Sequence, residues 1–371
     1  KPWLIISGIK GSSHRAPTTT GVPPTEEAES ATMTNRLTGN FEQINSELHL
    51  SGLRIAKLCR QQQRSGPFYL YDAAWIDGQY HKLDDAFKTT YPYGHQISYA
   101  VKANDALAIL KRLARAGAGA DIVSGGELDR ALAADIPANK IVFAGVGKTE
   151  IEIEKALIIG IQQFNVESFA ELERIASVAE RLGVIAPIAL RANPDVDAKT
   201  HAKITTGTKA DKFGISLNEV LPLAERTKTM PSVKLVAIAM HIGSQITSLA
   251  PFQQAYGVMA RLVEDLLRRG IELERLDVGG GIGVDYGDGI KTISFQSLAA
   301  VVTGALAPFG LPVLIEPGRS IVAEAGALLT QVQYIKHSYD RRFVIVDAGM
   351  HNLMRPALYD AVHPIVSVNE P

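Results

Sequence analysis

The chain has 371 residues, of which 46% are hydrophobic and 21% charged, a balance typical of globular proteins. Its net charge of -1 excludes the polybasic surface that binds nucleic acids or anionic membranes. The single cysteine, Cys59, excludes an internal disulfide and a Cys-cluster metal site, and no apolar run approaches the ~20 residues that cross a bilayer. We therefore expect a soluble, cytoplasmic protein with neither a nucleic-acid nor a membrane partner.

The first residues differ in composition from the rest. Residues 1–32 are rich in Thr, Pro, Ser and Glu, which predicts a disordered or extraneous segment. Residues 33–72 form a lead-in segment, and within it Cys59 lies in a polar helical run, where we expect an unreactive thiol. Near the end of this lead-in, "GPFYLYD" (66–72) predicts a strand that joins a second domain.

Strand-like and helix-like runs alternate from residue 97 onward. The candidate strands are 97–102, 119–124, 140–145, 162–168, 187–193, 235–243, 274–281 and 312–319. The candidate helices, with apolar residues at helical spacing, are 106–116, 126–134, 149–159, 169–182, 252–269 and 295–306. Eight strands with crossovers predict a parallel (β/α)8 TIM barrel over residues 73–320. The alternative is an open doubly wound sheet, but no dinucleotide fingerprint follows its first strand.

Two stretches depart from this alternation. The segment 193–214 is a long loop after a strand, and loops of that length are usually functional. After residue 320, two β-rich runs are joined by the polar turn "SYDRR" without a helix. This predicts an antiparallel β domain over residues 321–371, the incomplete start of a β-sandwich.

The chemistry of such a barrel lies at the carboxyl ends of its strands, where few residue types occur. The candidates are Lys102, Asp121, Arg191, His241, Ser244, Gly279, Gly280, Gly281, Glu316, Gly318 and Arg319. They include no His and carboxylate cluster at metal-ligand spacing, so we expect no metal.

Each of these motifs has a plain reading beside the functional one. Lys102 is either a Schiff-base lysine, whose pKa can fall on desolvation, or a solvent-facing residue at the end of a strand. Gly279–Gly281 allow close backbone approach and leave N–H groups for a phosphate, although glycine-rich turns are common. His241 is either a catalyst or a hydrogen-bonded core residue. Glu316, if buried, needs a partner.

Together these residues fit one cofactor. Pyridoxal 5'-phosphate requires a lysine for its aldehyde, a backbone cradle for its phosphate, a partner for its ring nitrogen and a flat group against its ring. The motifs "YAVKAN", "HIGSQ", "DVGGGIGVDY", "IEPGRS" and "MRPALYDA" resemble, in this order and spacing, the fold-type III decarboxylases that use this cofactor. Within that family the resemblance is closest to members that act on diaminopimelate.

The resemblance implies a role for each candidate. Lys102 would hold the cofactor as a Schiff base and protonate the substrate carbon, and His241 would stack on the ring. Glu316 would face the ring nitrogen and favour decarboxylation over racemisation, with Asp121 and Arg191 lining the pocket. The phosphate would be held by Ser244, Gly279, Gly280, Gly281, Gly318 and Arg319. The distal end of the substrate would be held by Arg319, Arg355 and Tyr359.

The resemblance also implies a homodimer with shared active sites, and it implies that the family's sequences continue beyond Pro371. The expected reaction converts meso-diaminopimelate into L-lysine and carbon dioxide. Two alternatives remain open at this point. One is a decarboxylase of another amino acid, such as ornithine, arginine, lysine or a carrier-bound one. The other is a homologue or fragment that binds the cofactor without turnover.

Overall fold

The computed structural model describes residues 3–7, 39–61, 66–197, 212–286, 290–359, 361 and 363–368. The chain divides into two compact units, which we call the β unit and the barrel unit. The β unit comprises residues 1–76, 284–291 and 321–371, and the barrel unit comprises residues 77–283 and 292–320. The stretch 284–291, which the sequence places within the barrel region, thus packs with the β unit.

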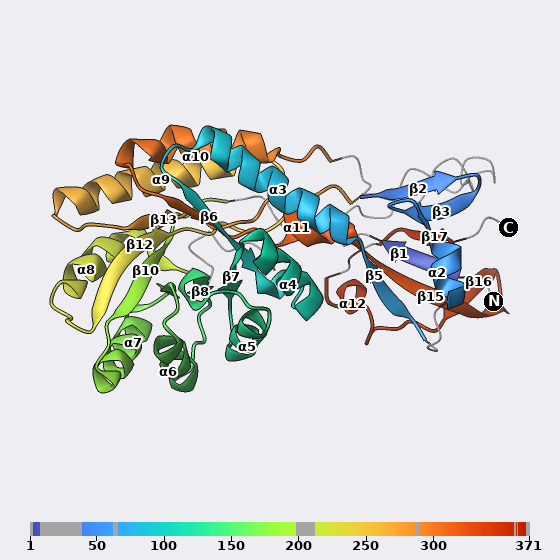
Figure 1. The fold of residues 1–371 in the computed structure, drawn as a ribbon, viewed down its shortest axis with the longest axis horizontal. Coiled ribbons are helices and arrows are strands. Elements are labelled where there is room, and N and C mark those ends of the chain that lie inside the picture. The colour runs from blue at the N-terminus through green and yellow to red at the C-terminus, as the bar shows by residue number, and fades with distance from the viewer. Residues whose placement is uncertain are drawn as a thin grey trace. The chain divides into compact units, whose positions relative to one another are not determined.

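Eight parallel strands close into a barrel, which confirms the predicted (β/α)8 fold (Figure 1). They are β6 (His95–Ala100), β7 (Gly119–Ile122), β8 (Ile141–Phe143), β9 (Gln163–Val166), β10 (Ala186–Asn193), β12 (Val233–Ala239), β13 (Arg275–Asp277) and β14 (Val313–Ile315). The pairing of β9 with β10 and of β14 with β6 closes the ring. A short strand, β11 (Ile215–Ser216), extends the sheet beside the end of β10.

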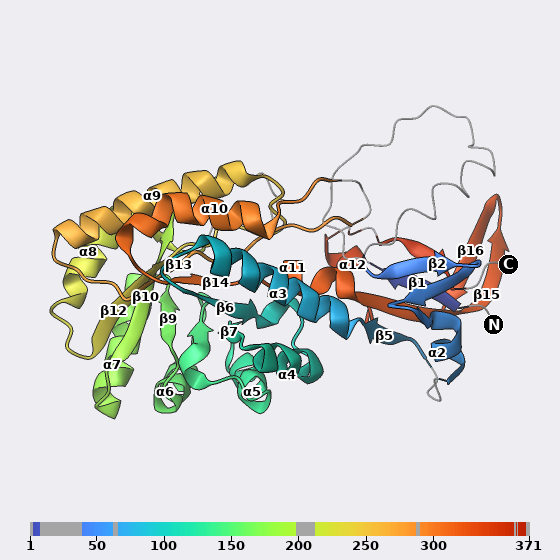
Figure 2. The same ribbon diagram turned by 45° about the horizontal axis from the view of Figure 1, so that its top comes forward.

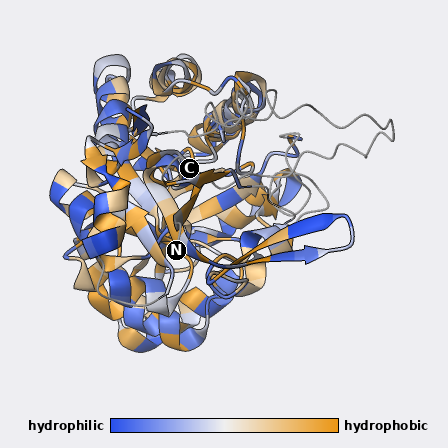
Figure 3. Cartoon of the chain, turned by 90° about the vertical axis from the view of Figure 1, so that its right-hand side faces the viewer, coloured by the Kyte–Doolittle hydropathy of each residue, from blue (hydrophilic) through white to orange (hydrophobic). Residues whose placement is uncertain are grey.

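The helices of the barrel unit include all six that the sequence predicts. These are α4 (Leu107–Ala116), α5 (Gly125–Ala133), α6 (Glu150–Ile159), α7 (Phe169–Leu182), α9 (Leu249–Arg268) and α10 (Phe295–Leu306). In α4 the residues Ile109, Leu110 and Leu113 are buried at helical spacing, and the left-handed Gly117 ends the helix. Figure 3 shows hydrophilic and hydrophobic residues alternating along the helical ribbons.

Two helices of more than ten residues were not predicted from the sequence, α3 (Ala73–Thr90) and α8 (Leu217–Thr227). The α3 helix begins directly after Asp72, whose Oδ1 accepts hydrogen bonds from the N–H groups of Ala74 at 2.9 Å and Trp75 at 3.2 Å. This is an N-cap, which satisfies donors that have no partner within the helix. The α8 helix contains Pro222, a residue that argues against a helix when the sequence is read alone.

The β unit contains an antiparallel sheet in the order β16-β15-β1-β17, with β5 also paired to β15. Its long strands are β15 (Gly326–Ser338) and β16 (Arg341–Val346), which flank the predicted polar turn and confirm antiparallel pairing after residue 320 (Figure 2). The β5 strand (Phe68–Tyr71) pairs with β15, as the sequence suggested for "GPFYLYD". A separate meander consists of β2 (Phe41–Ile44), β3 (Glu47–Leu50) and β4 (Leu53–Arg54).

The prediction that residues 1–32 are disordered or extraneous is wrong for Trp3–Ser7. These residues form β1, which lies between β15 and β17 (Ile365–Ser367) and pairs antiparallel with both. The physical reason is the apolar run "WLII", whose Ile5 is fully buried in a cluster with Cys59 of α2 (Ile55–Gln61). Residues 8–32 lie outside the described residues. Burial raises the pKa of the Cys59 thiol to about 11, which agrees with an unreactive cysteine.

A buried ion pair joins two crossovers of the barrel. The amine of Lys148 donates to Glu171 Oε1 at 2.6 Å and to the carbonyls of Gly145 at 2.7 Å and Asn165 at 2.8 Å. All three protons of the amine therefore have acceptors. The other oxygen of Glu171 accepts from the N–H of Glu167 at 2.7 Å, so the pair holds the end of β9.

We expect Lys148→Met to lower the free energy of unfolding by about 3–5 kcal/mol, because it leaves the Glu171 carboxylate buried without a charge partner. The matched control is Lys155→Met, which breaks the exposed pair with Asp129 and should cost at most about 1 kcal/mol. Urea unfolding followed by circular dichroism measures both. Equal losses in the two variants would contradict the structural role of the buried pair.

Candidate active site

Lys102 lies directly after β6, where the 3-10 turn η1 (Val101–Ala103) leads toward α4. The nearest acid in the chain, Asp105, lies three residues further on and pairs with Arg130. In the fold, the neighbouring parallel strand β7 supplies an acid for Lys102, because Ala100 is in register with Asp121. The Lys102 amine lies 2.8 Å from Asp121 Oδ2.

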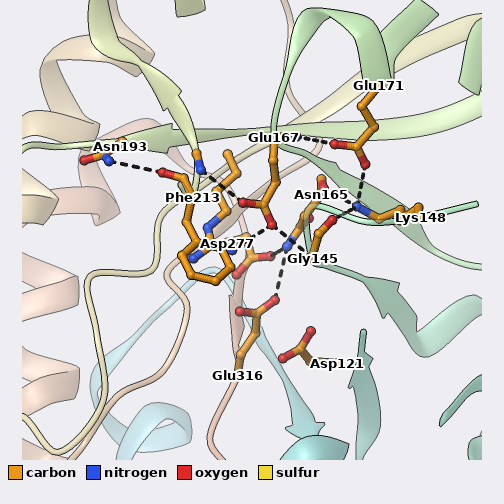
Figure 4. Close-up of polar contacts among 12 residues, drawn as sticks. Asp121, Gly145, Lys148, Asn165, Glu167, Glu171, Asn193, Phe213, Asp277 and Glu316 are labelled. Atoms are coloured by element: carbon orange, nitrogen blue, oxygen red, sulfur yellow. Dashed lines mark hydrogen bonds and ion pairs between the residues drawn. The ribbon is translucent and has the colours of Figure 1, made fainter. Parts of the chain in front are cut away.

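Asp121 leaves one buried oxygen unsatisfied. The residue is 1% exposed, and its Oδ1 atom has no hydrogen-bond partner among the residues that the structure describes. Figure 4 shows its carboxylate below the network that surrounds Glu316. Buried polar atoms are almost always hydrogen-bonded, so this oxygen suits a donor from a bound molecule.

The electrostatic surroundings of Lys102 keep its amine charged. Burial acts to lower the pKa of the amine, but the carboxylates of Asp121 and Glu316 outweigh that effect, and the pKa lies above its ordinary value. From the sequence, the pKa of Lys102 was expected to be able to fall on desolvation. In the fold, the neighbouring carboxylates raise it instead.

Glu316 follows β14 and lies beside Asp277 at the end of β13. The side-chain amide of Asn165 on β9 donates to both carboxylates, to Asp277 Oδ2 at 3.0 Å and to Glu316 Oε1 at 3.2 Å (Figure 4). Burial raises the pKa of Asp277 to about 6 and that of Glu316 well above its ordinary value. The negative charges of Asp277 and Asp121 raise the pKa of Glu316 further. Glu316 is thus buried with a partner, as predicted for a carboxylate in this motif.

Arg191, at the end of β10, forms an ion pair with Glu167. Its Nη1 lies 2.8 Å from Glu167 Oε1, and its guanidinium lies 5.2 Å from the centre of the Phe213 ring. Glu167 also accepts from the N–H groups of Gly145 at 2.9 Å and Gly214 at 3.0 Å. One carboxylate therefore holds three loops of the barrel's carboxyl end together. The middle of the predicted functional loop 193–214 lies outside the described residues.

His241 lies just beyond β12 and accepts a hydrogen bond at Nδ1 from the N–H of Gly280, at 3.2 Å. Burial, together with the positive charges of Arg191 and Lys102, lowers the pKa of the ring well below its ordinary value. The imidazole is therefore neutral at physiological pH. Because Nδ1 accepts, the ring proton belongs on Nε2.

The glycine turn after β13 serves packing as well as any ligand. A Cβ atom on Gly280 would lie 1.9 Å from the carbonyl oxygen of Glu316, and one on Gly279 would lie 2.3 Å from that of Met240. The N–H groups of Gly279 and Gly280 are used inside the protein, by Asp277 Oδ1 and by His241. Of the three glycines predicted to hold a phosphate, Gly281 alone has an N–H without an acceptor among the described residues. The phosphate role of this turn stays a prediction.

Ser244 and Arg319 meet at the same end of the barrel. The Ser244 hydroxyl accepts from Arg319 Nε at 3.2 Å and from Nη2 at 3.1 Å. Gly318, one residue earlier, packs so closely on the Lys102 turn that a Cβ would lie 3.0 Å from that of Ala103. The structure thus brings Ser244, Gly318 and Arg319 together with Lys102, as the sequence analysis expected of one site.

Arg355 and Tyr359 lie in the β unit, on the short helix α12 (Arg355–Tyr359). The guanidinium of Arg355 is 5.4 Å from the centre of the Tyr359 ring. These two residues therefore act as one feature of the β unit. Their part in substrate binding stays a prediction.

Four residues of the site network were not predicted from the sequence: Asn165, Glu167, Asp277 and Lys148. A signal for the first two was present in "QQFNVES", where Gln163, Asn165 and Glu167 alternate as polar residues within a buried strand. Alternate positions of a strand point to one face, so three polar residues in this run indicate a polar lining. Asp277 and Lys148 carry no comparable pattern.

These residues fit pyridoxal phosphate. The site offers an amine on a rigid turn, an unsatisfied oxygen on Asp121, a neutral imidazole and a carboxyl at Glu316. Arg319, Ser244 and the N–H of Gly281 supply donors for an anion. No group of three or more His, Cys, Asp or Glu at metal-binding geometry occurs among the described residues. Within the same residues, no helix is long and apolar enough to cross a membrane.

Known proteins match this sequence and fold. Residues 76–323 match the family described as pyridoxal-dependent decarboxylase, pyridoxal binding domain. A diaminopimelate decarboxylase of Neisseria meningitidis serogroup B is 46% identical over 302 residues, which cover 81% of this chain and 72% of that protein. One from Pseudomonas aeruginosa is 45% identical over 322 residues, covering 86% and 76%.

A solved structure extends the match to three dimensions. The crystal structure of diaminopimelate decarboxylase from Helicobacter pylori complexed with L-lysine superposes with a TM-score of 0.79 at 44% identity, and the match covers 84% of this chain and 77% of that one. The chain therefore belongs to the diaminopimelate decarboxylases, within the family of pyridoxal-dependent decarboxylases.

Proposed function

We propose that the chain catalyses the pyridoxal phosphate-dependent decarboxylation of meso-diaminopimelate to L-lysine and carbon dioxide. The observation that carries this proposal is the charge arrangement at the carboxyl end of the barrel. One lysine amine there faces the carboxylates of Asp121 and Glu316, and a neutral His241 lies nearby. The relatives at 45% and 46% identity bear this activity in their name, and the solved relative from Helicobacter pylori holds the expected product, L-lysine.

The division of labour follows from the residues. Pyridoxal phosphate, when bound, supplies an aldehyde for the substrate amine and a ring that takes up the electron pair left by the departing carboxylate. Lys102 would hold the aldehyde carbon and later return a proton to the substrate carbon. Glu316 would keep a proton at the ring nitrogen, which strengthens the ring as an electron acceptor. His241, neutral and flat, suits contact with the ring face.

We propose that arginines select the substrate by binding its distal end. Diaminopimelate carries a carboxylate at its distal end, and arginine binds carboxylates through two parallel hydrogen bonds. Arg319 is in the barrel unit next to Ser244, whereas Arg355 and Tyr359 belong to the β unit. We assign these three residues to the distal end. Lysine and ornithine present only an ammonium group there, for which arginine is a poor partner.

The homodimer with shared active sites and the cytoplasmic location belong to the same proposal. The family resemblance supports the dimer. The lone buried Cys59 agrees with a reducing compartment. Light scattering on the purified protein measures the oligomeric state directly.

The purified chain, supplied with pyridoxal phosphate, should release carbon dioxide from meso-diaminopimelate. We expect kcat/KM for lysine and ornithine to be lower by about 10⁴-fold, since the distal arginines then lose their partner. Trapped radiolabelled carbon dioxide measures each rate. Release from ornithine or lysine at a comparable rate would refute the substrate assignment.

Lys102→Ala should abolish the covalent bond to the cofactor. Borohydride reduction of the wild-type protein, followed by peptide mapping, should place a pyridoxyl group on Lys102 and on no other lysine. The control Lys111→Ala changes an exposed lysine of α4 and should keep the adduct. A wild-type adduct on another residue, or none, would reject the cofactor role of Lys102.

Asp121→Asn should lower the pKa of Lys102. The carboxylate raises that pKa because it stabilises the ammonium form. Its removal should therefore lower the pKa of Lys102 by roughly 1–3. Nuclear magnetic resonance of the ¹³C-dimethylated amine in the protein without added cofactor follows the titration. Asp129→Asn, which removes an exposed acid of α5, is the control. An unchanged pKa in Asp121→Asn contradicts the assigned pairing.

A further inference from the structure

The side chain of Asn165 is the only described group that donates a hydrogen bond to Asp277 and Glu316 at once. Its amide nitrogen carries two hydrogens, and the two acceptors lie 3.0 Å and 3.2 Å away. Its oxygen accepts from Gln163 Nε2 at 2.8 Å. The opposite orientation of the amide would turn an oxygen toward two carboxylates, so the network fixes its direction (Figure 4).

The backbone around Asn165 is also held in place. Its carbonyl accepts from the buried Lys148 amine at 2.8 Å, and the next inward-facing residue, Glu167, is bound to Arg191. Asn165 itself is 2% exposed. The side chain is therefore positioned from the strand as well as through its amide.

The two carboxylates that it joins share a dry environment. Asp277 is fully buried and Glu316 is 6% exposed. The charged groups that face Glu316 are Asp277, Asp121 of β7, Lys102 after β6 and Arg191 of β10. Three carboxylates thus meet two cations, and two adjacent buried carboxylates do not both ionise readily. Because Arg191 is also paired with Glu167, the acids outnumber the cations, and one proton held between Asp277 and Glu316 lowers this excess of negative charge.

We propose that Asn165 is a positioning residue that holds Asp277 and Glu316 as a pair with one proton between them. A pair with one proton carries a single negative charge, and Asn165 directs that charge to the ring nitrogen of the cofactor. Both amide hydrogens of Asn165 stabilise this single negative charge. The pair therefore does not take the proton from the ring nitrogen. This inference rests on the proposed function, since it concerns the cofactor at the same site.

The test uses Asn165→Leu, which keeps the number and branching of the side-chain heavy atoms and removes both donors. Without them the carboxylates take up protons more readily, and the proton moves from the ring nitrogen to Glu316. We expect this equilibrium to shift by about ten- to a hundredfold, the value for a lost hydrogen bond to a charged group. Reconstitution with ¹⁵N-labelled pyridoxal phosphate and nuclear magnetic resonance of the ring nitrogen reports it directly.

A second variant and a control complete the design. Asn165→Ser keeps one donor, which can serve only one carboxylate, so its ring nitrogen should shift in the same direction by less. If Asn165→Leu does not fold, this variant decides. Gln162→Leu removes an amide that pairs with Gln96 next to β9, and it should leave the ring nitrogen unchanged. A ring nitrogen that stays as in the wild type in both Asn165 variants overturns the inference.

A second readout needs no cofactor. In the wild-type protein without added cofactor, ¹³C-labelled Asp277 and Glu316 should titrate in two separate steps, and Asn165→Leu should raise the lower step by about one to two pH units. If the wild type forms no adduct at Lys102, the proposed function fails, and this titration still decides on the pair. Identical titrations in wild type and variant overturn the pair even where the enzyme decarboxylates diaminopimelate.

Discussion

The burial of charge at the carboxyl end of the barrel is the constraint on which the site depends. Three carboxylates and two cations face one another around Glu316, and all of them except Lys102, whose side chain is 48% exposed, are buried. Such a group is stable only if each charge has a partner at hydrogen-bond distance. The closed ring of parallel strands supplies those partners, because neighbouring strands end side by side and bring together residues far apart in sequence.

The same constraint explains the glycines and the neutral histidine. Only a turn without side chains lets β13 approach the ends of β12 and β14 closely enough for Gly280 to donate to His241. Burial, together with the positive charges of Arg191 and Lys102, lowers the pKa of His241 and keeps its ring uncharged. A neutral ring can lie against a cofactor without adding charge to a site whose balance is already set by Lys102 and Arg191.

The sequence predicts the strand ends well and the contacts between them poorly. The alternation of short strand-like runs with helical patterns located all eight barrel strands, and residues such as Lys102 and Glu316 followed from their places at strand ends. The partner of Lys102 could not be found in this way, because it depends on the register of β6 with β7. The strand β1 was missed because its partners, β15 and β17, lie more than 300 residues away in the chain, and nothing in the local sequence reveals them.

The polar face of β9 connects the charges of the site with the type of reaction. A strand inside a barrel is buried on both faces, so each polar side chain on it costs free energy unless its partners are in place. Gln163, Asn165 and Glu167 all have such partners, and each of the three contacts a charged residue of the site. The polar groups on such a face determine which acids of the site hold a proton. Because an electron-accepting ring favours loss of carbon dioxide, the position of one proton near Glu316 bears on which reaction the barrel performs.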